Sequence, residues 1–173
     1  GSTGATVDFK IFSPKKPERG PNDGPGDVTH VRRPNLRVKI TGPKSAKPGE
    51  DISNLIKVRA LNVGTAPAPG TNGTLSPANG FMIDVMLSSD TSVPAGFAVY
   101  SPSYSEDVLL LGGRISNTYD LPAGGNNSYS SGATIPANTP PGIYYLAVRI
   151  DPGNKVAESN EGDNTFFQRI RIR

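Results

Sequence analysis

The 173-residue chain contains no cysteine, no tryptophan and a single histidine. The missing cysteine excludes disulfides and metal sites built from thiolates. The missing tryptophan removes the commonest aromatic platform for a sugar ring. The one histidine, His30, lies beside Arg32 and Arg33 with no acidic partner nearby in the sequence, which favours a surface residue over a catalytic base. No segment approaches the ~18 consecutive apolar residues of a membrane helix, so we expect no membrane insertion.

Motifs of hydrolases and phosphate-binding enzymes are absent as well. The chain has no Gly-x-Ser-x-Gly nucleophile elbow, and its glycine-rich stretch GGRISNTYDLPAGG lacks the lysine of a phosphate-binding loop. Glycosidases need two carboxylates that face each other across a cleft, whereas the acids here gather in one segment near the C-terminus. We therefore expect no enzymatic activity.

Helical periodicity is scarce, because 20 glycines and 17 prolines interrupt nearly every span of ten residues. Strand patterning is plentiful: apolar and polar residues alternate with a period of two, which is typical of strands that bury one face. For the segment 81–87 this alternation predicts a core face and a water-facing side carrying Asp84. Strands are expected at 36–40, 56–61, 81–87, 144–150 and 170–172, with weaker candidates at 107–111 and 126–134. About seven strands separated by turn clusters predict an all-β fold, an immunoglobulin-like or fibronectin-III-like antiparallel sandwich.

The first 33 residues differ from the rest of the chain and are interpreted as an extended N-terminal arm, followed by the sandwich at 34–173. The opening GSTG is typical of a cloning remnant. Residues 1–47 hold ten Lys/Arg and four Asp/Glu, but prolines and glycines dilute these charges and no aromatic residues interleave with them, so we expect no nucleic-acid binding. A short strand near 6–12 is expected to add to an exposed sheet edge, either in its own chain or in self-association with a second copy.

Several motifs occur in an order that resembles the CARDB family, the cell-adhesion-related domain of bacteria and archaea. The resemblance runs from about Pro34 to Ile172 and includes PNLRVKI, VRALNVGTAPAPG and TIPANTPPGIYYLAVRIDPGNKVAESNEGDN. The segment Thr91–Glu106 is longer than is usual in that family. The resemblance implies an immunoglobulin-like, non-catalytic domain that is repeated or appended within large exported proteins.

The stretch DPGNKVAESNEGDNTF admits two interpretations. Asp151-Pro152-Gly153-Asn154 is a strong turn sequence, and the side chains of the asparagines in this stretch can cap backbone amides. In the first interpretation the stretch is an inter-strand loop whose polar groups bond to its own backbone, with Val156 pointing inward. Alternatively its oxygens bind calcium, which takes six to eight oxygen ligands, although the spacing does not match an EF-hand. The candidate calcium ligands are Asp151, Asn154, Glu158, Glu161 and Asp163. No other cofactor is expected.

Aromatic residues in the segment 91–106 are the candidates for partner or glycan contact, namely Phe97, Tyr100 and Tyr104. We interpret the protein as a non-catalytic interaction, adhesion or spacer module of a larger cell-surface or secreted protein. Its expected partners are other protein domains or cell-surface components. The alternative is a carbohydrate-binding accessory module of a polysaccharide-degrading enzyme.

Overall fold

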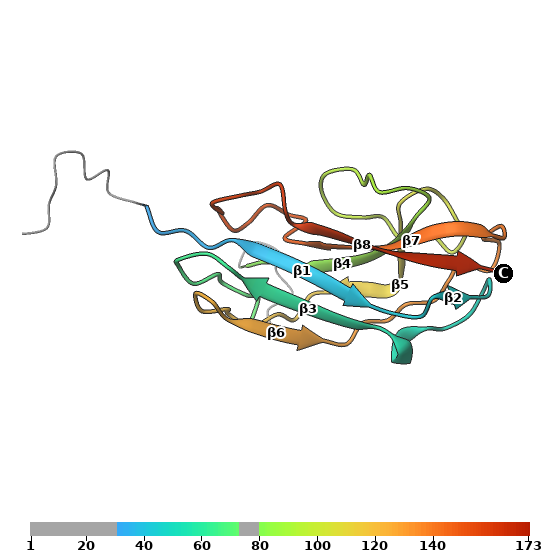
Figure 1. Ribbon diagram of the computed structural model, residues 1–173, viewed down its shortest axis with the longest axis horizontal. Helices are drawn as coiled ribbons and strands as arrows, with labels where there is room; N and C mark the ends of the chain where they lie inside the picture. The colour runs from blue at the N-terminus through green and yellow to red at the C-terminus, as the bar shows by residue number, and fades with distance from the viewer. Residues whose placement is uncertain (1–30, 73–79) are drawn as a thin grey trace, which may run out of the picture. The chain divides into compact units, whose positions relative to one another are not determined.

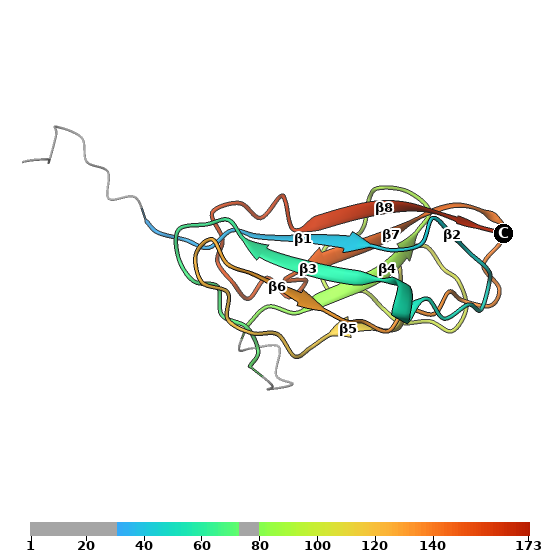
Figure 2. The same cartoon turned by 60° about the horizontal axis from the view of Figure 1, so that its bottom comes forward.

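The computed structural model describes residues 31–72 and 80–173, and the residues from Arg32 to Arg173 form one compact unit. The expected strand near 6–12 lies outside the described residues. Two sheets face each other, one with the strand order β1-β3-β6 and one with the order β2-β8-β7-β4-β5 (Figures 1 and 2). The chain therefore folds as an all-β sandwich of immunoglobulin-like architecture.

Seven of the eight strands overlap the predicted segments, five of them predicted from alternation and β5 and β6 as the weaker candidates. The exception is the two-residue strand β2, which pairs in parallel with β8, and one 3-10 turn, η1, follows it. The other neighbouring strands pair antiparallel. The elements are β1 (Leu36–Thr41), β2 (Ser45–Ala46), η1 (Ser53–Leu55), β3 (Lys57–Asn62), β4 (Ile83–Ser88), β5 (Val108–Ile115), β6 (Asn126–Tyr129), β7 (Gly142–Ile150) and β8 (Thr165–Ile172).

The core lies between the two sheets and consists mainly of aliphatic side chains. In β1 the buried residues Leu36, Val38 and Ile40 alternate with exposed ones, as the pattern predicts. Leu146 and Val148 face them from β7 and are wholly buried. Burying such side chains supplies most of the free energy that holds two sheets together, at ~25 cal/mol for each Å² of apolar surface removed from water.

Strand β4 departs from its predicted pattern, because every one of its residues is buried. The prediction that Asp84 faces water is wrong. The segment 91–107 folds over the outer face of β4, where the amide of Ala98 donates to Oδ2 of Asp84 at 2.9 Å. Arg114 of β5 also pairs with Asp84, with its Nε 2.8 Å from Oδ1. Periodicity reports which residues share a face, but it cannot report that a long loop returns to cover that face.

Candidate functional site

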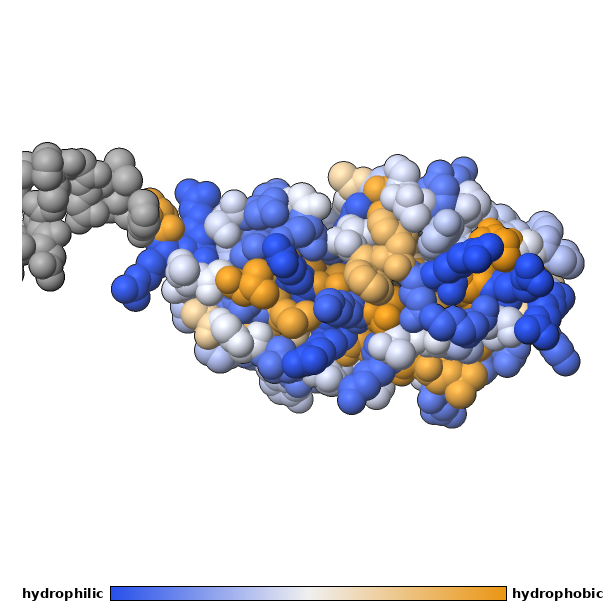
Figure 3. Space-filling model, viewed as in Figure 1, coloured by the Kyte–Doolittle hydropathy of each residue, from blue (hydrophilic) through white to orange (hydrophobic). Residues whose placement is uncertain are grey.

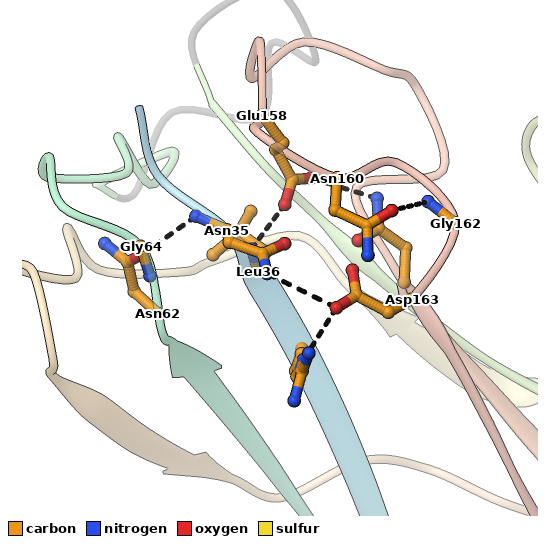
Figure 4. A network of polar contacts seen from close by, with 10 residues as sticks. Asn35, Leu36, Asn62, Gly64, Glu158, Asn160, Gly162 and Asp163 are labelled. Carbon is orange, nitrogen blue, oxygen red and sulfur yellow. Dashed lines mark hydrogen bonds and ion pairs between the residues drawn. The ribbon is translucent and has the colours of Figure 1, made fainter. Parts of the chain in front are cut away.

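The acidic loop 151–164 connects β7 to β8 in the five-stranded sheet and reaches across to β1 in the three-stranded sheet (Figure 4). The amide of Ser159 donates to the carbonyl of Pro34 at 2.9 Å, and the amide of Leu36 donates to the carboxylate of Glu158. The loop therefore joins the two sheets at the point where β1 begins.

Asp151 organises the first half of this loop. Its carboxylate accepts hydrogen bonds from the amides of Lys155 at 3.0 Å and Val156 at 2.8 Å, and its carbonyl accepts one from the amide of Asn154 at 3.0 Å. Asp151 and Asn154 both have positive φ, a conformation that Asn and Asp tolerate better than most residues. Val156 is buried, as expected. Burial raises the pKa of Asp151 even though the two amides lower it.

Glu158 is the most perturbed acid of the loop, with a side chain inside the protein and a residue exposure of 4%. Its Oε1 accepts a hydrogen bond from Nδ2 of Asn164 at 2.9 Å, while its Oε2 accepts the amide of Leu36. Burial raises the pKa of Glu158 to about 7, and the negative charges of Glu161 and Asp151 act in the same direction. A buried carboxyl without a neighbouring cation favours its neutral form.

Asp163 connects the loop to a second polar group at the start of β1. Its Oδ2 lies 2.6 Å from Nε of Arg37 and accepts a hydrogen bond from Nδ2 of Asn35 at 3.3 Å. The amide of Asn35 donates to Oδ1 of the buried Asn62 at 3.1 Å, and the amide of Gly64 donates to the same oxygen at 3.0 Å (Figure 4). The network thus runs from the 151–164 loop through β1 to the end of β3.

Three buried oxygens within this network have no hydrogen-bond partner among the described residues: Oδ1 of Asn35, Oδ1 of Asp163 and Oδ1 of Asn164. Asn35 and Asn164 are each only 9% exposed. An oxygen that is removed from water without a donor costs about 1–3 kcal/mol. Asn35 bonds to Asp163 and Asn164 bonds to Glu158, and buried oxygens without donors in such a network are typical of a place where a water or a cation completes the structure.

The five predicted calcium ligands all lie in the 151–164 loop, but they differ in whether their side-chain oxygens already accept hydrogen bonds from the protein. The carboxylates of Asp151 and Glu158 accept hydrogen bonds through both oxygens, and Oε1 of Glu161 accepts the amide of Glu158 at 2.9 Å. Asp163 keeps one oxygen free. Asn154 is exposed, and together with Asp151 and Glu161 it borders a cavity of about 220 Å³.

Within residues 31–72 and 80–173, no group of three or more His, Cys, Asp or Glu side chains could hold a metal ion. The oxygens without donors instead include two amides, from Asn35 and Asn164. Sequence reasoning did not consider Asn35 as a ligand. The available signal was the asparagine directly before the first strand, in PNLRVKI, but the chain separates it from Asp163 by 128 positions.

The three aromatic candidates for partner contact differ in how the fold uses them. The ring of Phe97 packs against the Arg114 guanidinium, whose Cζ lies 4.8 Å from the ring centroid. Tyr104 packs edge-on against Tyr144 at 5.2 Å, and burial raises its pKa. Tyr100 remains 46% exposed, beside Val99 at 77%. Tyr100 therefore presents the most free aromatic surface of the three.

Comparison with known proteins places these observations in a family. The family model CARDB matches residues 33–168. The fold is similar to a crystal structure of the CARDB domain of a Pyrococcus furiosus protein in complex with di-metal ions, with a TM-score of 0.53 and 17% identity over 83% of this chain and 97% of that chain. A solution NMR structure of the same archaeal domain gives a TM-score of 0.53 and 17% identity over 82% and 97%. No curated protein matches. Within the described segments, no helix is long and apolar enough to cross a membrane.

Proposed function

Since the chain belongs to the CARDB family, a family of non-catalytic domains, we propose that it serves as an interaction or spacer module within a larger cell-surface or secreted protein. The observation that carries this proposal is that buried polar side chains hold strands and loops of the domain together. The acids of the 151–164 loop and the pair of Asp84 with Arg114 brace strands and loops against one another. Side chains held in this way stiffen a module that has to keep its shape between neighbouring domains.

We place the contact surface of this module on the segment that covers β4, around Tyr100. Val99, Tyr100 and Leu111 are all exposed, and Tyr100 and Leu111 border a cavity of about 240 Å³ together with Pro102 and Pro136. Exposed apolar side chains gathered beside a hollow are typical of interaction surfaces. A tyrosine suits either a protein partner or a sugar ring, because its ring is apolar and its hydroxyl is polar.

The test compares Tyr100→Ala with Tyr119→Ala, which removes a tyrosine outside this surface that is 56% exposed, against 46% for Tyr100. Beads coated with each variant are measured for binding to bacterial cells that display the parent protein and to insoluble polysaccharides. The proposal expects cell binding by the wild type that Tyr100→Ala abolishes and Tyr119→Ala preserves. Binding to polysaccharide with the same dependence on Tyr100 would support the carbohydrate-binding alternative instead. Equal loss in both variants would contradict the placement of the surface, and hydrolysis of a polysaccharide would contradict a non-catalytic module.

A second proposal is a calcium site in the polar network, supported by the three oxygens that lack donors. Asp163 belongs to the predicted ligand set, and Asn35 and Asn164 would add amide oxygens of the kind that calcium accepts. Arg37 already compensates part of the charge of Asp163. We therefore expect weak binding, with a Kd on the order of 10⁻⁴–10⁻³ M, as in extracellular calcium modules. The archaeal CARDB domain that was solved with di-metal ions is consistent with this proposal.

The calcium proposal is tested by thermal unfolding in millimolar calcium and in EDTA. A bound ion raises the Tm of the wild type, because only the folded chain presents the site. Asp163→Asn should remove this rise, whereas Asp90→Asn, a change at an exposed carboxylate in another loop, should keep it. Equal Tm values of the wild type in calcium and in EDTA would exclude the site.

A further inference from the structure

A groove of about 460 Å³ lies where β2 pairs with the end of β8 in the five-stranded sheet, whereas the acidic loop 151–164 lies at the start of β8. Four of its six lining residues are cationic. The lining consists of Lys44, Ser45, Ile143, Arg169, Arg171 and Arg173. Figure 3 shows hydrophilic side chains gathered around the ends of β7 and β8, with an apolar area between them.

The geometry of β8 explains why these charges share one face. Ile170 and Ile172 point into the core and are wholly buried, so the alternate residues Arg169, Arg171 and Arg173 point outward. Alternate residues of a strand lie about 7 Å apart, which places Arg169, Arg171 and Arg173, the residue directly after β8, in a row along the strand direction. The amide of Arg171 donates to the carbonyl of Lys44 at 3.0 Å, which holds Lys44 beside them.

None of these four cations has an acidic partner among the described residues. The ion pairs among the described residues are Arg37 with Asp163 and Arg114 with Asp84, and neither involves a residue of the groove. Four uncompensated positive charges around one groove create a local potential that concentrates anions. Arginine adds geometric preference, because its planar group donates two parallel hydrogen bonds to a carboxylate or a sulfate.

We propose that this groove binds a linear anionic polysaccharide that carries carboxylate or sulfate groups. A polymer fits better than a single small anion, since the arginines form a line rather than a cage. Ile143 offers an apolar floor for the C–H face of a sugar ring. The groove is lined by no aromatic side chain on which a nucleic-acid base could stack, and the nearby Tyr145 and Phe167 pack edge-on against each other at 6.4 Å.

This site is independent of the Tyr100 surface and of the calcium proposal. It can therefore exist whether or not either of those is correct, and its failure leaves both untouched. It also differs in chemistry, because affinity for a polyanion comes from charge and falls steeply as the salt concentration rises.

The experiment measures binding of the full chain to dextran sulfate, polygalacturonate, neutral dextran and single-stranded DNA over a range of salt concentrations. The double variant Arg169→Gln/Arg171→Gln should lose about tenfold in affinity for the preferred polysaccharide at low salt, because two charge contacts disappear. The control Lys39→Gln/Lys57→Gln removes the same charge from exposed positions on the other sheet and should change the affinity by less than about threefold. The two anionic polysaccharides show whether sulfate or carboxylate is preferred.

Three results would overturn the proposal: wild-type binding to neutral dextran as tight as to either polyanion, an equal loss in the control variant, or DNA binding tighter than polysaccharide binding at the same salt concentration. All four substituted residues are exposed, so both double variants should melt at the wild-type temperature. If the arginine variant nevertheless unfolds, protection of Arg169 and Arg171 from arginine-selective chemical labelling by the bound polysaccharide replaces it as the test. An absence of protection would then count against the groove.

Discussion

Glu158 allows the polar network to be tested through the pH dependence of stability. Its pKa is about 7 in the folded chain, against 4.5 for an ordinary glutamate. Between these two values the folded chain binds a proton that the unfolded chain has released. Stability from this group is therefore fully present below pH 4.5 and is lost as the pH rises through about 7.

The magnitude follows from the difference between the two pKa values. Each pH unit corresponds to 1.36 kcal/mol, so the change from 4.5 to about 7 amounts to roughly 3 kcal/mol of unfolding free energy. The side chain is almost completely buried, so solvent screening reduces this figure little. For a chain of this size we expect the Tm of the wild type to fall by about 6–12 °C over that range on account of Glu158.

The variant Glu158→Gln isolates this contribution, because it keeps the shape of the side chain and cannot ionise. Its carbonyl can accept the amide of Leu36, and its amide can face Asn164, whose Oδ1 lacks a donor. Urea unfolding between pH 5 and pH 8 should show a decline in wild-type stability that is much smaller in the variant. Asp151 has a raised pKa as well, so the difference between the two proteins reports the ionisation of Glu158 together with its coupling to Asp151 and Glu161.

The control for this experiment is Glu106→Gln, which neutralises an exposed acid on another loop and should keep the pH dependence of the wild type. Parallel stability curves for the wild type and Glu158→Gln over the whole range would refute the reasoning. They would mean that Glu158 stays charged in the folded chain, as it would if a cation were bound beside it.

Four further substitutions probe the fold, and the first two form a pair. Arg114→Leu should lower the free energy of unfolding, measured in urea, by about 3–5 kcal/mol, because it leaves the buried carboxylate of Asp84 without its cation. Asp84→Asn should lower it by less, since the Arg114 that loses its partner is partly exposed to water. The reverse order of the two losses would contradict this account. Gly64→Ala should lower the free energy of unfolding by about 1–3 kcal/mol or more, because the added Cβ would lie 2.3 Å from the backbone nitrogen of Asn35. A variant with the Tm of the wild type would show that Gly64 and Asn35 do not approach each other so closely. Leu146→Ala should cost about 2–5 kcal/mol by leaving a cavity in the core, and a loss below 1 kcal/mol would argue against the packing of β7 between the sheets.

Local patterns were sufficient to predict most of the fold. The alternation in 36–40 and 144–150 matches β1 and β7, and the turn residues of 151–154 match the hydrogen-bonded turn of Asp151 and Asn154. These features depend on residues a few positions apart, which the sequence displays directly. The prediction for β4 failed because the segment 91–107 covers its outer face, where the amide of Ala98 bonds to Asp84, 14 positions earlier.

The candidate site was predicted only in part, for the same reason. The acidic loop and Asp163 were visible as a cluster of oxygens, and their role in calcium binding remains a prediction. Asn35 became a candidate only when the structure showed it beside Asp163. The aromatic residues of 91–106 were visible too, but only packing distinguishes Tyr104, which lies against Tyr144, from the exposed Tyr100.

From its sequence alone this protein could be recognised as a two-sheet sandwich of a known family, because strands and turns leave short repeating patterns and their order along the chain is distinctive. The tertiary structure alone decided which polar groups meet. It brought Lys44 beside the arginines of β8, and it joined Asn35 to Asp163 across 128 positions. Those contacts depend on the pairing of strands that are distant along the chain, and no local pattern of residues specifies which side chains such pairing brings together.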